Sequence, residues 1–205
     1  ADPRKNRVTL DGAPVAFDTP PDLVYVMLHK PRGVVVTAND PEGRPTASDL
    51  VKDFAAPGLV PVGRLDYASS GLLLFSNDHG LSDRLLDPKF HVAKEYDVKV
   101  RGDVSDETIQ KLRKERVRDG ADVFEPMDVR VETRNPKSTR LRVKIREGKN
   151  RQIRRQLLRF GHEVESLIRT AFGPLRLGTL APGAARPLSQ DEISLLRRAA
   201  KPPLG

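Results

Sequence analysis

A charged pair just ahead of an apolar run is the feature that most constrains the fold of this chain. Residues 72–75 (LLLF) have the composition of a buried strand, and Arg64 and Asp66 stand a few positions before it. A carboxylate that enters a protein core is destabilising unless it is paired or hydrogen-bonded. The fold must therefore accommodate Asp66 at the edge of its core, and we take Asp66 as the first candidate for a reactive group.

The other predicted elements are mostly strands, with few helices between them. Alternation and turn residues predict strands at 24–28, 34–37, 92–100, 127–133 and 139–145, with a turn at 30–33 between the first two. Helical patterns cover 81–86 and 105–117, and a capping-box pattern at 189–192 predicts a closing helix. Because strands and helices do not alternate regularly, we expect an α+β fold with a largely antiparallel sheet.

The charge balance points to a polyanionic partner. Lys and Arg outnumber Asp and Glu by 36 to 28, and the resulting net charge of +8 favours a nucleic acid bound through its phosphates. The absence of Cys excludes disulfides and thiolate chemistry, and the four scattered His form no zinc-binding pattern. No membrane span or secretion leader is visible. We therefore expect a cytoplasmic protein without membrane contact, whose catalysis would use carboxylate, Tyr, Lys or Arg side chains.

A second informative stretch, at 146–162, predicts a helix that Asn150 caps and Gly161 ends. At about 100° per residue, three apolar side chains share one stripe of this helix: Ile153, Leu157 and Phe160. The opposite face carries three cations: Arg151, Arg155 and Arg159. This basic face is either a solvated surface or a phosphate-binding one, and the pattern alone leaves both interpretations open.

Arg154 lies at the margin of the apolar stripe, next to Leu158. A guanidinium at the edge of a core needs a partner, and its planar fork suits a carboxylate. Asp66 is the obvious candidate for that partner. We therefore predict that Arg154 pairs with Asp66.

A third cluster stands at 94–100, where alternation places Tyr96 on the face that it shares with Lys94 and Val98. Tyr96 is one of only three tyrosines in the chain. From the residues alone, a tyrosine that fills the core and satisfies its hydroxyl is the simpler interpretation, and a functional role is the alternative.

Together these segments resemble the pseudouridine synthases, specifically the RsuA/RluB/RluE-type subgroup that acts on ribosomal RNA. The family's first signature is similar to GRLD at 63–66, SGLLL at 70–74 and NDHG at 77–80, and its second to KEY at 94–96. The third is similar to EGKNRQIRR at 147–155, followed by LIR at 167–169 and GPLRLG at 173–178. MLHKPRG at 27–33 looks like the opening of this subgroup's catalytic domain, so the resemblance covers roughly residues 24–196.

The resemblance implies a pseudouridine synthase fold, in which flanking helices cover a mostly antiparallel mixed sheet with a central catalytic cleft. It divides the chain into a segment 1–20, which looks like the end of an S4-type RNA-binding module plus a linker, and a catalytic domain at 21–205. The implied reaction converts uridine to pseudouridine in ribosomal RNA without a cofactor or a metal ion. The implied partner is ribosomal RNA or a ribosomal assembly intermediate, and we expect a monomer.

The resemblance also assigns roles to single residues. Asp66 is the nucleophile that acts on a flipped-out uridine, Arg154 is its partner, and Tyr96 lies against the base as a proton carrier or a stacking surface. Arg64 resembles the arginine that fills the gap left by the flipped base, and Leu167 resembles an apolar residue that supports the pocket. Phosphate contacts are expected from five cations: Lys30, Arg32, Arg151, Arg155 and Arg169.

Two other functions compete with this interpretation. A non-catalytic RNA-binding module for ribosome assembly is disfavoured, because a chain relieved of catalysis has little reason to retain a buried charged pair. A metal-dependent nuclease would need several acidic ligands that converge on magnesium or manganese, and no motif accompanies the two nearest candidates, Asp78 and Asp87. The motifs do not identify the target uridine.

Overall fold

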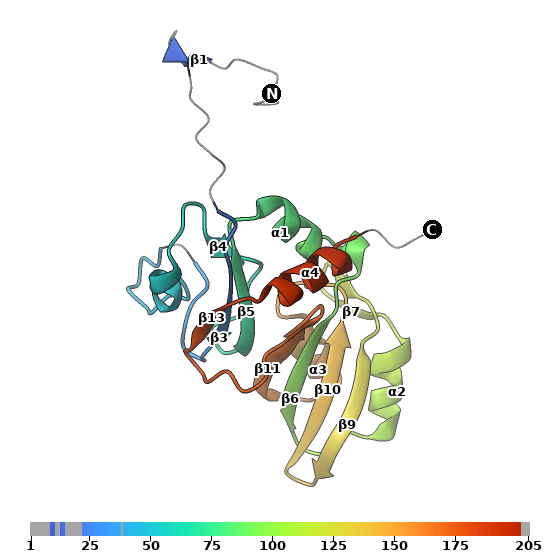
Figure 1. Cartoon of the computed structure of the whole chain (residues 1–205). Helices are drawn as coiled ribbons and strands as arrows, with labels where there is room; N and C mark the ends of the chain where they lie inside the picture. The colour runs from blue at the N-terminus through green and yellow to red at the C-terminus, as the bar shows by residue number, and fades with distance from the viewer. Residues whose placement is uncertain (1–8, 11–12, 15–21, 38, 202–205) are drawn as a thin grey trace.

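The computed structural model describes residues 9–10, 13–14, 22–37 and 39–201 (Figure 1). Near the N-terminus, β1 (Thr9–Leu10) pairs with β2 (Ala13–Pro14) in antiparallel register. The rest of the predicted N-terminal segment, with its S4-like end and linker, lies outside the described residues. That part of the domain assignment stays a prediction.

One mixed sheet forms the centre of the folded region (Figure 1). Two short strands extend it, β4 (Val60–Pro61) beside β5 and β12 (Leu175–Arg176) beside β11. Among the described strands of this sheet, β5 and β11 are parallel and the other pairs are antiparallel, which confirms the predicted α+β class. Its main path runs through β13 (Ala185–Pro187), β3 (Tyr25–Lys30), β5 (Ser70–Ser76), β11 (Val164–Phe172), β6 (Lys94–Arg101), β10 (Ser138–Ile145) and β9 (Asp128–Asn135).

Helices cover both faces of the sheet, and β5 contributes to the core on each side. Leu72 and Leu74 belong to the cluster that includes α1 (His79–Leu86) and α4 (Gln190–Ala199). Leu73 and Phe75 belong to the opposite cluster, which includes α2 (Asp106–Lys114), α3 (Gln152–Arg159) and the 3-10 helix η1 (Asp49–Phe54). Successive side chains of a strand point to opposite faces, so the uninterrupted apolar run is buried on both, as predicted.

A close approach between β5 and β11 positions the loop that carries Asp66. Gly71 of β5 pairs with Arg169 of β11, and a Cβ at Gly71 would collide with the Arg169 backbone. The φ of Gly71 is 110°, a conformation that only glycine adopts readily. The pairing therefore needs glycine, and it holds the start of β5 against the middle of β11.

The predicted strand at 34–37 is not formed. Among the described residues, this segment forms an isolated β-bridge, between Val35 and Thr46, and not a ladder of paired residues. Val34 is instead buried in the core, and Val36 packs against that core from an irregular segment. The β-branched composition reflects this packing, which needs no strand.

The beginning of α3 also differs from the prediction, whereas its end agrees with it. Arg151, not Asn150, is the N-cap; it has a left-handed φ of 50° and makes no side-chain capping bond. At the other end, Gly161 N–H donates to the Leu158 carbonyl at 2.9 Å, and φ at Gly161 is 81°. The capping box of Ser189 at the start of α4 is confirmed.

Candidate active site

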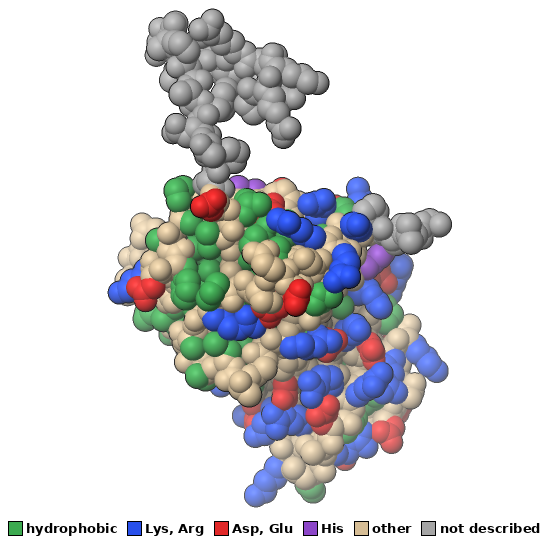
Figure 2. Space-filling view, in the orientation of Figure 1, with side chains coloured by type: hydrophobic (Ala, Val, Ile, Leu, Met, Phe, Trp, Pro, Cys, Tyr) green, Lys and Arg blue, Asp and Glu red, His purple; other side chains and the backbone are tan. Residues whose placement is uncertain are grey.

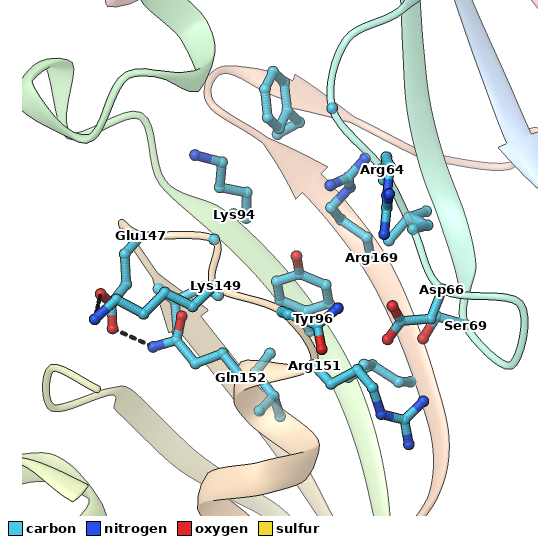
Figure 3. A pocket seen from close by; sticks show the side chains of 18 of the residues that line it. Arg64, Asp66, Ser69, Lys94, Tyr96, Glu147, Lys149, Arg151, Gln152 and Arg169 are labelled. Carbon is cyan, nitrogen blue, oxygen red and sulfur yellow. Dashed lines mark hydrogen bonds and ion pairs between the residues drawn. The ribbon is translucent and has the colours of Figure 1, made fainter. Parts of the chain in front are cut away.

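A cavity of about 710 Å³ lies where the loop before β5, the strands β6 and β11, and the loop before α3 meet. This volume is typical of small-molecule sites in proteins. The sequence predicted a pocket or catalytic role for four residues of its wall: Arg64, Asp66, Tyr96 and Leu167 (Figure 3). Segments far apart in the sequence are therefore brought to one site.

Asp66 lies in the loop between β4 and β5, half-buried, and its carboxylate borders the cavity (Figure 3). The loop is fixed through its backbone, because Ser69 N–H donates to the Asp66 carbonyl at 3.0 Å and Gly33 N–H to the Tyr67 carbonyl at 2.9 Å. Among the described residues, no hydrogen bond or ion pair engages the carboxylate itself. An anionic oxygen that is held in place and still free is suited to act as a nucleophile.

The predicted ion pair between Arg154 and Asp66 is not found among the described residues. The Arg154 guanidinium donates instead to the carbonyls of Val164 at 2.9 Å and Ala68 at 3.1 Å. Arg154 therefore ties α3 to β11 and to the loop that carries the carboxylate. The helical phase correctly placed Arg154 near this loop, but it does not determine which atom of the loop a guanidinium reaches.

The charges of Arg154 and Asp66 nevertheless act on each other. Burial lowers the pKa of Arg154, nearby Arg151 and Arg32 add to that effect, and Asp66 opposes it. Asp66 consequently stands in the field of a guanidinium that remains protonated.

Tyr96 is both a core residue and part of the cavity wall. It lies on β6 between Val143 of β10 and Arg169 of β11, and it is buried. Its ring forms the middle of the wall in Figure 3. Leu167 lines the same cavity from β11. The two interpretations of Tyr96 are therefore compatible: the ring fills the core and also faces the site.

Lys30 is a correction to the predicted set of phosphate contacts. Its side chain is 0% exposed, and Nζ donates to the carbonyls of Pro31 at 2.9 Å and Val34 at 2.8 Å. Burial lowers the pKa of Lys30 to about 8, while Asp66 opposes that change and Arg169 adds to it. A lysine beside a Pro-Arg-Gly turn suggests exposure, but the end of β3 is buried, so this ammonium secures the turn instead.

Arg155 is a second correction, because its guanidinium is already paired. It contacts Asp119 and Asp122, each at 2.6 Å, and lies over the Phe124 ring at 4.7 Å. Arg155 thereby anchors the hairpin of β7 (Val117–Asp119) and β8 (Asp122–Phe124) to α3. Its partners come from a distant segment that the local helical pattern could not reveal.

Arg169 is a third correction. Its side chain is 4% exposed, and Nε donates to the Leu72 carbonyl at 2.7 Å. It lines the cavity and is not a surface contact.

Arg32 and Arg151 remain available for phosphate. Both side chains are exposed, and neither takes part in an ion pair among the described residues. Both lie close enough to Arg154 to lower its pKa. Arg32 and Arg151 therefore remain the predicted phosphate contacts: both lie near the site, and the charge of neither is neutralised by a described carboxylate.

Elsewhere, much of the basic charge is neutralised locally. Figure 2 shows Lys and Arg interleaved with Asp and Glu over the part of the sheet that Figure 1 labels β6, β9 and β10. Arg140 pairs with Asp97 there at 2.6 Å, and Arg142 with Glu132 at 3.2 Å. The count of 36 Lys and Arg side chains therefore overstates how many cations are free to bind RNA.

Lys94 and Phe172 also line the cavity, although neither was predicted from the sequence as a site residue. Lys94 belongs to the KEY motif and points to the same face as Tyr96, and this alternation is the signal that could have found it. Phe172 comes from the end of β11, and only the sheet register brings it opposite Lys94.

Within the described residues, no group of three or more His, Cys, Asp or Glu side chains is placed to hold a metal ion. None of the described helices has the length and apolar character needed to cross a membrane.

Comparison with known proteins relates this arrangement to one family. A family described as RNA pseudouridylate synthase matches residues 24–159. An uncharacterised RNA pseudouridine synthase of Aquifex aeolicus is 36% identical over 199 residues, covering 96% of this chain and 78% of the relative. Ribosomal large subunit pseudouridine synthase B of Bacillus subtilis is 35% identical over 193 residues, covering 94% of this chain and 78% of the relative.

A solved structure agrees with these sequence relatives. The crystal structure of a pseudouridylate synthase superimposes with a TM-score of 0.76 at 28% identity, over 89% of this chain and 76% of that chain. The similarity therefore extends well beyond the matched signatures.

Proposed function

The chain belongs to the RNA pseudouridylate synthase family and is an RNA pseudouridine synthase, and on that premise we propose that it isomerises one uridine of ribosomal RNA with Asp66 as the nucleophile. The observation that carries the proposal is the free Asp66 carboxylate, fixed by its backbone at a nucleotide-sized cavity. The reaction rearranges bonds within one nucleotide and consumes no cofactor.

In the proposed reaction, a carboxylate oxygen of Asp66 bonds to C1′ of the ribose while the bond from C1′ to N1 of the base breaks. The electron pair of the broken bond leaves with the base. The base then turns and bonds to C1′ through C5, Asp66 is released, and the hydrogen of C5 is lost as a proton while N1 gains one. Atoms and charge balance without an external reagent.

The surroundings of Asp66 support this role. The carboxylate interacts with the charges of Lys30 and Arg154, and it opposes the effect of burial on the pKa of each. Arg154 also fixes the Asp66 loop, so it acts as a positioning residue. The carboxylate borders a cavity, and a uridine must leave its base stack to reach it. Tyr96 would then lie against the base, and Arg64 at the edge of the cavity would occupy the gap in the RNA.

Ribosomal RNA is supported as the substrate by two observations. The Bacillus subtilis relative carries the name of a large-subunit ribosomal enzyme, and exposed cations near the site suit a phosphate backbone. A monomeric state, a cytoplasmic location and an assembly intermediate as substrate stay predictions.

Mapping pseudouridines across the ribosomal RNA of a strain that lacks this protein tests the substrate. We expect one modified position of the parent strain to be an unmodified uridine in the deletion strain, and to be restored by the wild-type gene but not by an Asp66→Asn gene. An unchanged ribosomal map, together with a position lost from transfer RNA, would refute the ribosomal assignment.

A further inference from the structure

Two buried cations of the cavity, Lys94 and Arg169, have no role in the steps above. Their side chains are 7% and 4% exposed, and both line the cavity. Among the described residues, neither forms an ion pair, and the terminal Nη2 of Arg169 is buried without a hydrogen-bond partner. Uncompensated charge in a protein interior is costly, so its presence at a site suggests a ligand that compensates it.

The two cations form one group around the Phe172 ring. The Lys94 ammonium lies 5.4 Å from the ring centroid and the Arg169 guanidinium 5.3 Å from it. Each lies within the distance at which an aromatic ring attracts a cation, so Phe172 holds both at one end of the cavity.

The carboxylates of the cavity do not neutralise this end. Glu147 accepts hydrogen bonds from the Gln152 side chain and from Glu125 N–H, and its other oxygen lies 3.8 Å from Lys149. Asp66 is the other acidic side chain of the lining. In Figure 3 the Tyr96 ring lies between Lys94 and Asp66, so the free carboxylate and the ammonium stand on opposite sides of the ring.

We propose that Lys94 and Arg169 contact the carbonyl oxygens of the bound uracil and stabilise the negative charge that the base acquires when its bond to C1′ breaks. This inference rests on the proposed function. If the ribose lies at Asp66 and the base lies along Tyr96, the oxygens of the base face the two cations.

The charge balance of the reaction explains why cations belong there. Before the step, the carboxylate of Asp66 is anionic and the base is neutral. When the ester oxygen bonds to C1′ and the bond to N1 breaks, the electron pair moves to the base, so the negative charge now resides on N1 and on the conjugated carbonyl oxygens. Fixed cations that face these oxygens favour the transition state over the ground state, which is the condition for catalysis.

A phosphate of the RNA backbone is the alternative anion. The burial of both cations argues against it, because the RNA backbone remains outside a cavity into which a single base is flipped. Arg32 and Arg151 already offer exposed charge for phosphate.

The test compares three variants in single-turnover reactions at saturating protein. Lys94→Met removes the charge and retains the length of the side chain, and Lys94→Arg retains the charge. Lys99→Met is the matched control, because Lys99 is an exposed cation of the same strand that pairs with Glu165 outside the cavity. Each protein is first checked for folding by thermal unfolding and then assayed on RNA with uridine or 5-fluorouridine at the target position.

We expect Lys94→Met to slow loss of the target uridine by about 100-fold to 1,000-fold, the effect of removing one preorganised donor to a developing anion. Fluorine at C5 stabilises the base anion by itself, so the defect with 5-fluorouridine should be roughly tenfold smaller. RNA affinity should stay within about threefold. Lys94→Arg should recover part of the rate, and Lys99→Met should match the wild type.

Other outcomes overturn the inference in different ways. Weakened RNA binding with equal slowing on both substrates would identify a phosphate contact. An unchanged rate for Lys94→Met, while the wild type forms pseudouridine, would refute the role of Lys94 and leave the proposed function intact. A folded wild-type protein that isomerises no uridine in any RNA would refute the proposed function itself, and this inference with it.

Discussion

Charged residues in and around the cavity differ mainly in whether their charge is compensated. Asp66 is fixed by its backbone and left free, whereas Arg155 is fully engaged by two carboxylates. Lys94 carries a buried charge whose described contact is an aromatic ring. Such an arrangement reduces stability, and proteins retain it at sites where the charge is used. The compensation of each charge therefore separates the residues proposed to act in the reaction from those that stabilise the fold.

The cost of the Lys94 charge is measurable as pH-dependent stability. Burial, with a smaller contribution from Arg169, lowers the pKa of Lys94 to about 8 from 10.5. Between about pH 8 and pH 10.5, Lys94 binds a proton more fully in the unfolded chain than in the folded protein. In this range the contribution of Lys94 to the free energy of unfolding therefore rises with pH. Below pH 8 the full cost of the buried charge is present.

Lys94→Met should consequently raise the free energy of unfolding at pH 7, by roughly 1 to 3 kcal/mol. Urea unfolding at pH 7 and at pH 10 measures this difference. The difference in the free energy of unfolding between variant and wild type should narrow toward pH 10, because Lys94 of the folded wild type loses its proton above about pH 8. Other titrating groups contribute equally to both proteins and cancel in the comparison. A variant that is less stable than the wild type at pH 7, with the same pH dependence, would show that the ammonium stabilises the fold.

At the scale of elements, the site is built by contacts between segments distant in the sequence. Gly71 allows β5 to approach β11, and the carbonyl of Ala68 in the Asp66 loop accepts a hydrogen bond from Arg154 of α3. The parallel pairing of β5 with β11 and the hydrogen bond from Arg154 thus both constrain the loop that carries Asp66. The position of Asp66, the proposed nucleophile, therefore depends on α3 and on β11 together.

Arg154→Met should lower both stability and turnover. The change leaves two carbonyls without their charged donor, and hydrogen bonds of this kind contribute about 1.5 to 3 kcal/mol each. Arg159→Met is the matched control, because it removes the same charge from an exposed position of the same helix. Chemical unfolding and single-turnover rates of both variants test the prediction, and equal behaviour of the two would contradict the positioning role.

The order of elements was largely predictable from the sequence, whereas the pairing of side chains was not. Periodicity identified the buried strand at β5 and the alternation at β6, and the signatures identified Asp66, Tyr96 and Leu167 as one site. Burial of Lys30 and the carboxylate partners of Arg155 depend on segments that meet only in the folded chain. Local patterns report phase and exposure, and they do not report tertiary partners.

At the scale of the whole molecule, charge is divided between a neutralised surface and a free one. Lys99 of β6 and the Arg140 and Arg142 side chains of β10 pair with nearby carboxylates. Arg32 and Arg151 near the site take part in no ion pair among the described residues. Membership of a family of RNA-modifying enzymes, together with the free carboxylate, favours an isomerase over the two alternatives considered from the sequence, a non-catalytic RNA-binding module and a metal-dependent nuclease.

The salt dependence of RNA binding tests this division of charge. The double variant Arg32→Gln/Arg151→Gln should weaken binding and reduce the slope of log affinity against log salt by about 1 to 2, because each phosphate contact adds about 0.7 to 0.9 to the slope. Arg140→Gln/Arg142→Gln removes the same charge from the paired surface and should leave the slope nearly unchanged. Equal slopes for the two double variants would contradict the assignment.

The central claim is that Asp66 opens the reaction on uridine. The most direct measurement follows tritium released from RNA labelled at C5 of uridine, because C5 loses its hydrogen only when the base is rejoined to C1′ through that carbon. We predict that the wild-type protein releases tritium from one uridine per RNA, and that Asp66→Asn releases none above background while RNA affinity stays within a few fold. Release by Asp66→Asn at the wild-type rate would contradict the account.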